Sequence, residues 1–448
     1  MAESPQVVFI ASHLGYPMES TPLGGGAMVG LRLTRAFAAS GACCLSVLGS
    51  GSESPGPGMD YIRLDTRAGR GKDPDLVRLS EWEYADFCRD FGSEAARFIL
   101  SRPGAFPPEE TLLVVNDVSE APDMARLAQA GYRQCSIWHV DVVEFFNRIY
   151  LGRFLSPRQV AQAFRLWEDA GLGPLTPGVL KLVFEKQRVA VENSDLLIVP
   201  SRGMAGVLEE CYPDRTPGAA PLGERIRVVP WGSWKEDASF AEEDARRLAA
   251  HYQIGPGTRV LMTLSRISPE KGIDILLEAL RLLEEQGRLS GDLCLFVCGE
   301  PAFMRGAAYS RRVREAAQRL GSVRVFFPGY LASREKQAYF RLAHLFVSPS
   351  VHESYGLTLA EAMRVGLPVL AGDHHGAREM LGEDCGRILL YEGVPAEALV
   401  EALAGLLADS EELRRMGERA RRRSEGADFS EAARTVLAAV LSLPLKKS

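Results

Sequence analysis

The sequence lacks several features that would each define a class of protein. Its 448 residues carry a formal net charge of −6, so the chain has no excess of positive charge with which to bind nucleic-acid phosphates. No apolar run approaches the roughly 20 residues that a membrane-spanning helix needs. The N-terminal stretch has no basic region before its short apolar run, which is typical of a strand and not of a secretory signal. We therefore expect a cytoplasmic protein without a nucleic-acid partner.

The cysteines do not have the spacing of a zinc site. The chain has eight of them, and the closest pairs are Cys43 with Cys44 and Cys294 with Cys298. Neither pair is matched by a second pair or by a histidine at zinc-ligand spacing. We expect reduced, buried thiols instead.

Short apolar runs rich in β-branched residues alternate with helix-period segments along the chain. Hydrophobic residues make up 46% and charged residues 25% of the sequence, which is typical of a globular protein of two or three domains. The runs form two series, a first at 7–12, 44–49, 112–117, 135–140, 196–201 and 226–232, and a second at 259–266, 293–300, 323–330, 344–350 and 368–373. This alternation predicts an α/β fold with two doubly wound parallel sheets in tandem.

A polar and acidic stretch at 233–258 separates the two series. We therefore expect a first domain over 1–235 and a second over 236–426. A C-terminal helix over 427–448 is expected to pack back toward the first domain. Residues 52–110 are less regular and are expected to form an insertion in the first domain.

Two glutamates, Glu353 and Glu361, have seven residues between them in HESYGLTLAEAMRVGLPVLAG. A strand precedes this stretch, and the Gly-x-Pro near its end predicts a helix over about 357–365. Glu353 is then expected in the loop and Glu361 one turn inside the helix. Carboxylates at these places would accept hydrogen bonds from hydroxyl groups.

The start of the same helix predicts an anion site. The backbone N–H groups of Gly356, Leu357 and Thr358 would have no helical acceptor, and the helix dipole favours a negative group such as a diphosphate there. A diphosphate flanked by hydroxyl groups on both sides is the arrangement of a nucleotide sugar.

Two cations would offset the charge of such a diphosphate. LSRISPEKGID places Arg266 and Lys271 on the loop that follows the first strand of the second series. Arginine presents a planar fork of donors and lysine a compact charge, and both suit phosphate oxygens. The alternative, that either one is only a surface residue, is less consistent with their joint place at the end of a strand.

SRISPEKGID, PGYLASREKQAYFRLAHLFVSPS and HESYGLTLAEAMRVGLPVLAGD resemble, in order and spacing, the nucleotide-binding half of retaining glycosyltransferases of family 4. The resemblance is strong over 257–395 and weaker elsewhere. It implies the GT-B architecture, in which two Rossmann-like doubly wound domains face each other across a cleft. The first domain would bind the acceptor and the second the nucleotide sugar.

The resemblance also implies roles for residues of the second domain. Arg266 and Lys271 would bind the donor diphosphate and stabilise the departing nucleotide. Glu353 would contact hexose hydroxyls and Glu361 the ribose. The stretch at Tyr330 and Leu331 would lie against the base, and backbone amides at 356–358 would complete the phosphate site.

In the first domain, the resemblance covers a glycine-rich loop and one histidine. Gly25 and Gly26 lie in GGGAMVG, which is similar to the family's loop over the diphosphate and acceptor, although a merely flexible loop would have the same composition. His139, after the strand in SIWHVD, is similar to the family's active-site histidine that meets the transferred sugar. A structural role is the alternative for a lone histidine.

The sequence departs from the family pattern in three places. PWGSW stands at 230–234 where the family usually has Pro-Asn-Gly-Val-Asp. AGDHHGARE places His374 and His375 near the expected hexose, which leaves the identity of the sugar open. Residues 141–192 match no acceptor pattern.

The resemblance implies a retaining hexosyltransferase that needs no metal or other cofactor. A UDP-sugar is favoured as donor on family frequency, with a GDP-sugar as the alternative, and the acceptor is a sugar, a small molecule, a lipid-linked compound or a protein. The basic run at 414–426 predicts a solvated helix face, with contact at the inner face of a membrane as the alternative.

Three other functions compete with this interpretation. A nicotinamide-dependent dehydrogenase is disfavoured because GGGAMVG does not match G-x-G-x-x-G and does not follow the first strand directly. A sugar-nucleotide epimerase of GT-B shape would share the second domain. A catalytically silent module that only binds nucleotide sugars would keep the charged residues without turnover.

Overall fold

The computed structural model describes residues 5–17, 21, 24–67, 75–76, 79–152, 154–213, 220–236, 238–289, 291–301, 306–382, 384–391 and 395–445. The chain divides into two compact units. Unit 1 comprises Met1–Trp231 with Ser430–Ser448, and unit 2 comprises Gly232–Phe429. The expected domain limits at 235/236 and 426/427 lie close to these boundaries.

Unit 1 is built on a seven-stranded sheet in the order β3-β2-β1-β4-β5-β6-β7. Its paired strands run parallel, as the sequence predicts. The central strand β4 is buried along its whole length because helices cover both faces of the sheet. The strands are β1 (Gln6–Ile10), β2 (Cys44–Gly49), β3 (Asp60–Arg63), β4 (Thr111–Val115), β5 (Arg133–Ile137), β6 (Leu196–Val199) and β7 (Ile226–Val228).

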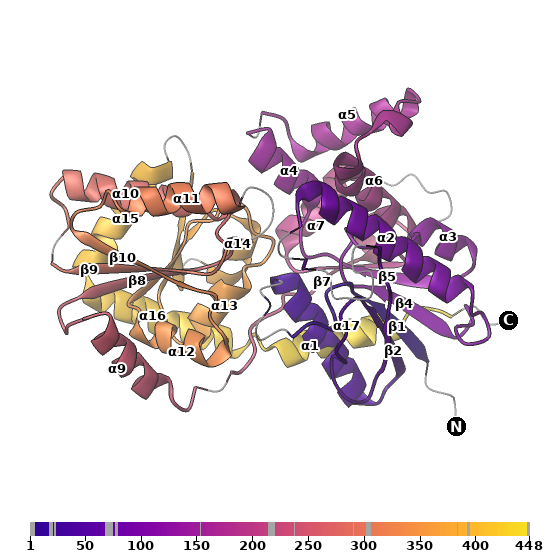
Figure 1. Ribbon diagram of the computed structural model, residues 1–448, viewed down its shortest axis with the longest axis horizontal. Helices are drawn as coiled ribbons and strands as arrows, with labels where there is room; N and C mark the ends of the chain where they lie inside the picture. The colour runs from indigo at the N-terminus through magenta and orange to yellow at the C-terminus, as the bar shows by residue number, and fades with distance from the viewer. Residues whose placement is uncertain are drawn as a thin grey trace. The chain divides into compact units, whose positions relative to one another are not determined.

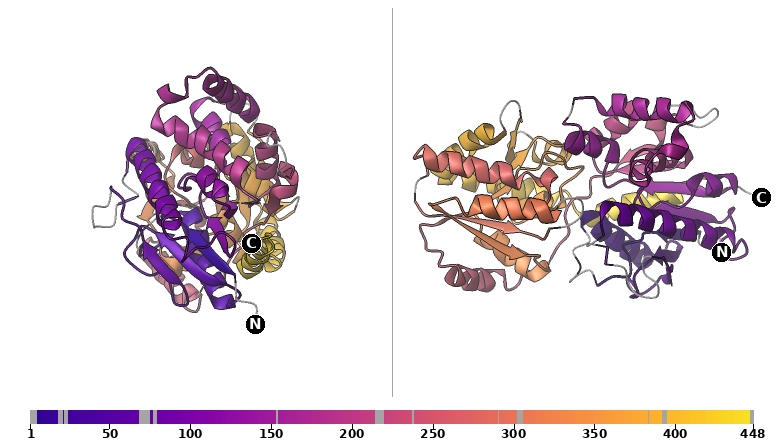
Figure 2. Two further views of the ribbon diagram at one scale, coloured as in Figure 1. Left: turned by 90° about the vertical axis from the view of Figure 1, so that its right-hand side faces the viewer. Right: turned by 45° about the horizontal axis from the view of Figure 1, so that its top comes forward.

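Helices α2, α3 and α6 pack against one another on one face of this sheet, and α4 and α5 lie beside them (Figure 1). The further views in Figure 2 show helices on both sides of the strands. The helices of the unit are α1 (Gly25–Ser40), α2 (Glu81–Leu100), α3 (Met124–Gln129), α4 (Val142–Tyr150), α5 (Pro157–Asp169), η1 (Gly173–Leu175), α6 (Gly178–Asn193), α7 (Arg202–Cys211), α8 (Leu222–Arg225) and, starting at the boundary with unit 2, α17 (Phe429–Leu441).

Residues 52–110, expected to be an insertion, contribute regular elements to the doubly wound unit instead. Strand β3 pairs with β2 at the edge of the sheet, and α2 packs on α3 and α6. The sequence has no apolar run at β3, because this edge strand is only partly covered and its residues are half-buried or exposed. Helix α2 begins at a capping box, in which the Ser80 and Glu83 side chains bond each other's backbone N–H. Residues 68–74 and 77–78 of this segment lie outside the described ones.

Unit 2 has a six-stranded parallel sheet in the order β10-β9-β8-β11-β12-β13. The strands are β8 (Arg259–Leu264), β9 (Leu293–Cys298), β10 (Val323–Gly329), β11 (Leu345–Ser348), β12 (Val369–Gly372) and β13 (Gly386–Leu389). The sequence predicts all of them except β13, an edge strand with a mixed burial pattern.

Figure 1 shows α10, α11 and α15 on one face of this sheet and α9, α12 and α16 on the other. The helices are α9 (Ala241–His251), η2 (Pro269–Lys271), α10 (Ile273–Glu285), α11 (Gly306–Ala317), α12 (Ser333–Leu342), α13 (Leu357–Arg364), α14 (His375–Leu381), α15 (Pro395–Ala408) and α16 (Ser410–Glu425). Helix α13 confirms the prediction of a helix that starts at Leu357. The expected two parallel, doubly wound sheets are therefore present.

The eight cysteines carry no disulfide. Six are buried, as expected, whereas Cys43 is half-buried and Cys44 is exposed at the start of β2. Among the described residues, no helix combines the length and the apolar character that crossing a membrane requires.

Candidate functional site

The candidate donor site lies at the topological switch point of unit 2. Strand β8 has β9 on one side and β11 on the other, so the loops that follow β8 and β11 leave the sheet in opposite directions and border a crevice. These loops touch, because the Val351 N–H donates to the Glu270 carbonyl at 2.9 Å. Gly272 has a φ of 63°, and a Cβ there would lie 2.2 Å from the Pro349 carbonyl oxygen. Only glycine allows this close approach.

Lys271 and Glu353 meet across that crevice. The Nζ of Lys271 lies 2.5 Å from Oε1 of Glu353, and the side chains are only 9% and 20% exposed. Burial raises the pKa of Glu353, but the nearby charges of Lys271, His374 and Arg266 lower it overall. Glu353 is therefore an ionised carboxylate beside a cation, and two residues that the sequence predicts for one site lie together.

Arg266 belongs to the same loop and is held by a residue that the sequence analysis missed. Its Nη2 lies 3.4 Å from Oε1 of buried Glu270, which also accepts a 2.6 Å hydrogen bond from the Ser268 hydroxyl. The Arg266 side chain is 35% exposed and so remains accessible to a ligand. The sequence offered one signal for this contact, because Glu270 stands between the two basic residues of SRISPEKG.

Helix α13 begins in this region at Leu357, and its N-cap Gly356 has a φ of 90° and no side chain that could accept from the first N–H groups. The anion site at these N–H groups stays a prediction. A Cβ on Gly356 would lie 3.8 Å from Cε1 of His374, so this histidine borders the helix start. His374 is buried and caps α14, because its Nδ1 accepts from the Ala377 N–H at 3.1 Å. His375 is half-buried in the first turn of α14.

Glu361 lies in α13 as predicted, with its carboxylate toward α12. Its Oε1 is 2.7 Å from Nζ of Lys336, and both side chains are nearly buried. The sequence analysis did not single out Lys336. Tyr330 and Leu331 follow β10 directly, with Tyr330 36% exposed and Leu331 buried, so Tyr330 presents the accessible surface.

In unit 1, Gly26 and His139 lie together. A Cβ on Gly26 would be 2.9 Å from Cδ2 of His139, so the first turn of α1 packs against the imidazole. Asn116, at the end of β4, joins the two: its Nδ2 donates to the Gly26 carbonyl at 3.2 Å and its Oδ1 lies 3.2 Å from Nε2 of His139. Gly25 is exposed at the start of the helix.

Burial, aided by the charge of His13, lowers the pKa of His139 to about 4. The imidazole is therefore neutral near pH 7. Its ring centroid lies 6.0 Å from that of Trp231, part of the PWGSW departure.

A buried ion pair next to this histidine was missed by the sequence analysis. Nδ1 of His13, after β1, lies 2.8 Å from Oε1 of Glu120, after β4, and β1 and β4 are neighbours at the switch point of this sheet. The Tyr84 hydroxyl donates to the same oxygen at 2.9 Å, while Oε2 of Glu120 has no hydrogen-bond partner within the described part of the chain. Burial and the charge of Glu120 raise the pKa of neighbouring Asp117 to about 6. The sequence offered one signal for this polar cluster, the two polar residues at the end of the apolar run LLVVND.

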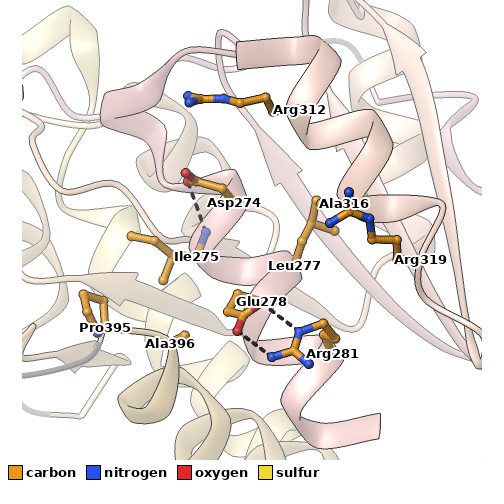
Figure 3. A pocket seen from close by; sticks show the side chains of 10 residues that line it. All are labelled: Asp274, Ile275, Leu277, Glu278, Arg281, Arg312, Ala316, Arg319, Pro395 and Ala396. Carbon is orange, nitrogen blue, oxygen red and sulfur yellow. Dashed lines mark hydrogen bonds and ion pairs between the residues drawn. The ribbon is translucent and has the colours of Figure 1, made fainter. Parts of the chain in front are cut away.

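A surface groove of unit 2 lies elsewhere. It runs between α10, α11 and the start of α15, and Figure 3 shows Arg312 above Asp274, Arg319 beside Ala316, and Glu278 bound to Arg281. None of its lining residues is a predicted site residue, and we assign it no part in the donor site. Among the described residues, no cluster of His, Cys, Asp and Glu could hold a metal ion.

Comparison with known proteins supports the fold and the family. Residues 244–423 match the family model described as glycosyl transferases group 1. The lipopolysaccharide 1,2-N-acetylglucosaminetransferase of Salmonella typhimurium is 30% identical over 224 residues, which are 49% of this chain and 55% of that protein. The chain spans about half the length of the curated relatives it matches first.

Two solved structures resemble the whole chain. Sucrose-phosphate synthase from Thermosynechococcus elongatus has a TM-score of 0.70 at 19% identity, covering 98% of this chain and 99% of that one. Anabaena HepE, in complex with UDP-glucose, has a TM-score of 0.65 at 16% identity, covering 98% of this chain and 100% of that one. These likenesses concern the fold. Residues 244–423 are thus similar to the glycosyl transferases group 1 family, and the two Rossmann-like units have the GT-B fold.

Proposed function

We propose that the protein is a glycosyltransferase that moves a hexosyl group from a nucleoside-diphosphate sugar to an acceptor hydroxyl. The main observation behind this proposal is the contact between Lys271 and Glu353, which lies at the β8/β11 switch point beside the start of α13. It combines a cation for a phosphate, an ionised acceptor for sugar hydroxyls and a helix N-terminus for an anion. The family match and the UDP-glucose complex of HepE support the same donor class.

Within this proposal, Arg266 and Lys271 bind the diphosphate together with backbone amides of 356–358. Glu353 accepts hydrogen bonds from the hexose and Glu361 from the ribose, while the base lies against Tyr330 and Leu331. Uridine is the favoured base and guanosine the alternative, as in the sequence analysis. Because two cations and a helix dipole already offset the diphosphate, no divalent metal is needed.

The proposed mechanism retains the configuration of the sugar. The bond from the anomeric carbon to the diphosphate breaks, and the acceptor oxygen forms its bond on the same face. The acceptor proton passes to the departing phosphate, whose growing negative charge Arg266 and Lys271 stabilise. His139, neutral near pH 7, forms a hydrogen bond with a sugar hydroxyl. Gly25 and Gly26 allow the backbone of α1 to approach the donor.

The deciding experiment follows the donor and the product. The purified full chain is incubated with a panel of UDP- and GDP-sugars and cell extract, the glycosylated acceptor is identified by mass spectrometry, and its anomeric configuration is read by proton NMR. We expect release of free nucleotide and an α-linked product from an α-linked donor. A β-linked product would contradict retention, an epimerised donor without free nucleotide would indicate an epimerase, and binding without turnover would indicate a silent module.

The candidate acceptors are sugars, small molecules, lipid-linked compounds and proteins. Fractions of the cell extract test these classes separately. Activity on an acceptor in vesicles of anionic lipid, with co-sedimentation of the protein, would support peripheral action at the inner face of a membrane.

A further inference from the structure

Lys336 joins two buried carboxylates of unit 2. Its Nζ lies 2.7 Å from Oε1 of Glu361 and 3.1 Å from Oε1 of Glu236. The three side chains are only 12%, 7% and 6% exposed, so the contacts are shielded from solvent. Burial lowers the pKa of Lys336, but its two carboxylates raise it overall. The lysine is therefore charged, and one ammonium group serves two carboxylates.

Glu236 is held in place by more than the lysine. Its Oε1 accepts from the Trp234 indole at 2.9 Å and from the Ser333 hydroxyl at 3.1 Å, and its Oε2 accepts from Nε2 of Gln337 at 3.0 Å. Ser333, Lys336 and Gln337 all belong to the first turns of α12. Burial raises the pKa of Glu236, while Lys336 and the hydrogen bonds from Trp234 and Gln337 lower it overall. Glu236 thus fixes the position of Lys336, and Lys336 fixes Glu361.

We propose that Lys336, anchored by Glu236, is a positioning residue that keeps Glu361 ionised and aimed at the ribose of the nucleotide. This inference rests on the proposed function, which assigns the ribose to Glu361. An ionised carboxylate only accepts hydrogen bonds, so it binds ribose hydroxyl groups that donate and gains nothing from a 2′,3′-dideoxyribose, which lacks both of them. A carboxylate without its buried cation would take up a proton or turn toward water. Lys336 therefore determines how strongly the site distinguishes a ribonucleotide from its 2′,3′-dideoxy form.

The test compares UDP with 2′,3′-dideoxy-UDP by calorimetry on the full chain. The wild-type protein is expected to bind UDP about tenfold or more tightly than the dideoxy form, because hydrogen bonds to a charged group are lost. In Lys336→Met the ratio should fall below about threefold, and Lys336→Arg should restore it. Lys235→Met, which changes the exposed lysine next to Glu236, is the matched control and should keep the wild-type ratio. GDP and its dideoxy form are titrated in the same way for a guanosine donor.

Thermal unfolding shows that each variant is folded, and Lys336→Gln replaces the methionine variant if that one is not. A folded neutral variant with the wild-type ratio would overturn the inference, and so would an arginine variant with the ratio of the methionine variant. A wild-type protein that binds neither UDP nor GDP would instead refute the proposed function. A wild-type protein that binds but shows no ribose preference refutes the role of Glu361 and leaves the diphosphate site standing.

Discussion

The Nζ of Lys271 lies 2.5 Å from Oε1 of Glu353, and the two residues come from loops after neighbouring strands. The pair holds a carboxylate ionised and aimed into the switch point before any donor arrives. A diphosphate bound beside Lys271 would share this cation with Glu353. In the proposed function, this arrangement places the phosphate contact and the sugar contact of a nucleotide sugar next to each other.

Replacing Lys271 by alanine should weaken nucleotide binding. The change removes a charge-assisted contact to the diphosphate, and we expect a loss of about 1.5 to 3 kcal/mol in the binding free energy of UDP or GDP. Titration calorimetry measures it, with Lys235→Ala as a control at an exposed site. Unchanged affinity in the Lys271 variant would contradict the assignment of the diphosphate site.

His139→Ala and Glu361→Ala should affect different kinetic constants. The histidine variant should lower kcat more than it raises the donor KM, because the proposed contact forms with the sugar as it is transferred. The glutamate variant should chiefly raise the donor KM, because the ribose contact is made equally in the ground state and the transition state. Steady-state kinetics with the identified acceptor separates the two cases, and the reverse pattern would exchange the assigned roles.

Acidification should destabilise the folded protein partly through His139. Its folded pKa of about 4 lies below the usual histidine pKa of 6.5, so between these values the unfolded chain binds the proton and the folded one does not. Lowering the pH from 7 to 5 should therefore cost the wild type about 1 to 2 kcal/mol more than it costs His139→Gln. Denaturant unfolding at both pH values tests this.

His13 makes an opposite contribution to that pH dependence. Burial lowers the pKa of His13, but the charge of Glu120 raises it more, so the pKa is raised overall. The stability that protonated His13 contributes is therefore present below pH 6.5 and is lost as the pH rises through the pKa of His13 in the folded protein. His13 is present in both the wild type and His139→Gln, so its effect largely cancels when the two stability losses are compared. Equal losses in the wild type and His139→Gln would show that His139 is not held neutral.

Chelation of divalent metals should leave activity intact. In the proposed function, Arg266, Lys271 and the start of α13 supply the positive charge for the diphosphate, so EDTA should not lower the initial rate measurably. The assay is nucleotide release after dialysis against the chelator, with a metal-dependent glycosyltransferase as a positive control. Activity that disappears and returns with magnesium or manganese would assign the charge compensation to a metal.

Local patterns in the sequence predicted much of the fold and several residues of the candidate site. Buried strands such as β4 appear as uninterrupted apolar runs because helices cover both of their faces, whereas edge strands β3 and β13 left no such run and were missed. Gly356 and the helix that starts after it were visible because a helix start has a local signature.

Contacts between distant residues were decided only by the tertiary structure. Lys271 and Glu353 were predicted for one site from their residue types and positions and from a family resemblance, but the pairing of β8 with β11 is what brings them within hydrogen-bonding distance. Lys336 gave no sign of its role, since its carboxylate partners lie 100 and 25 residues away in the sequence. A local pattern records which face of an element is buried, while a buried ion pair depends on which elements become neighbours, and only the folded chain determines that.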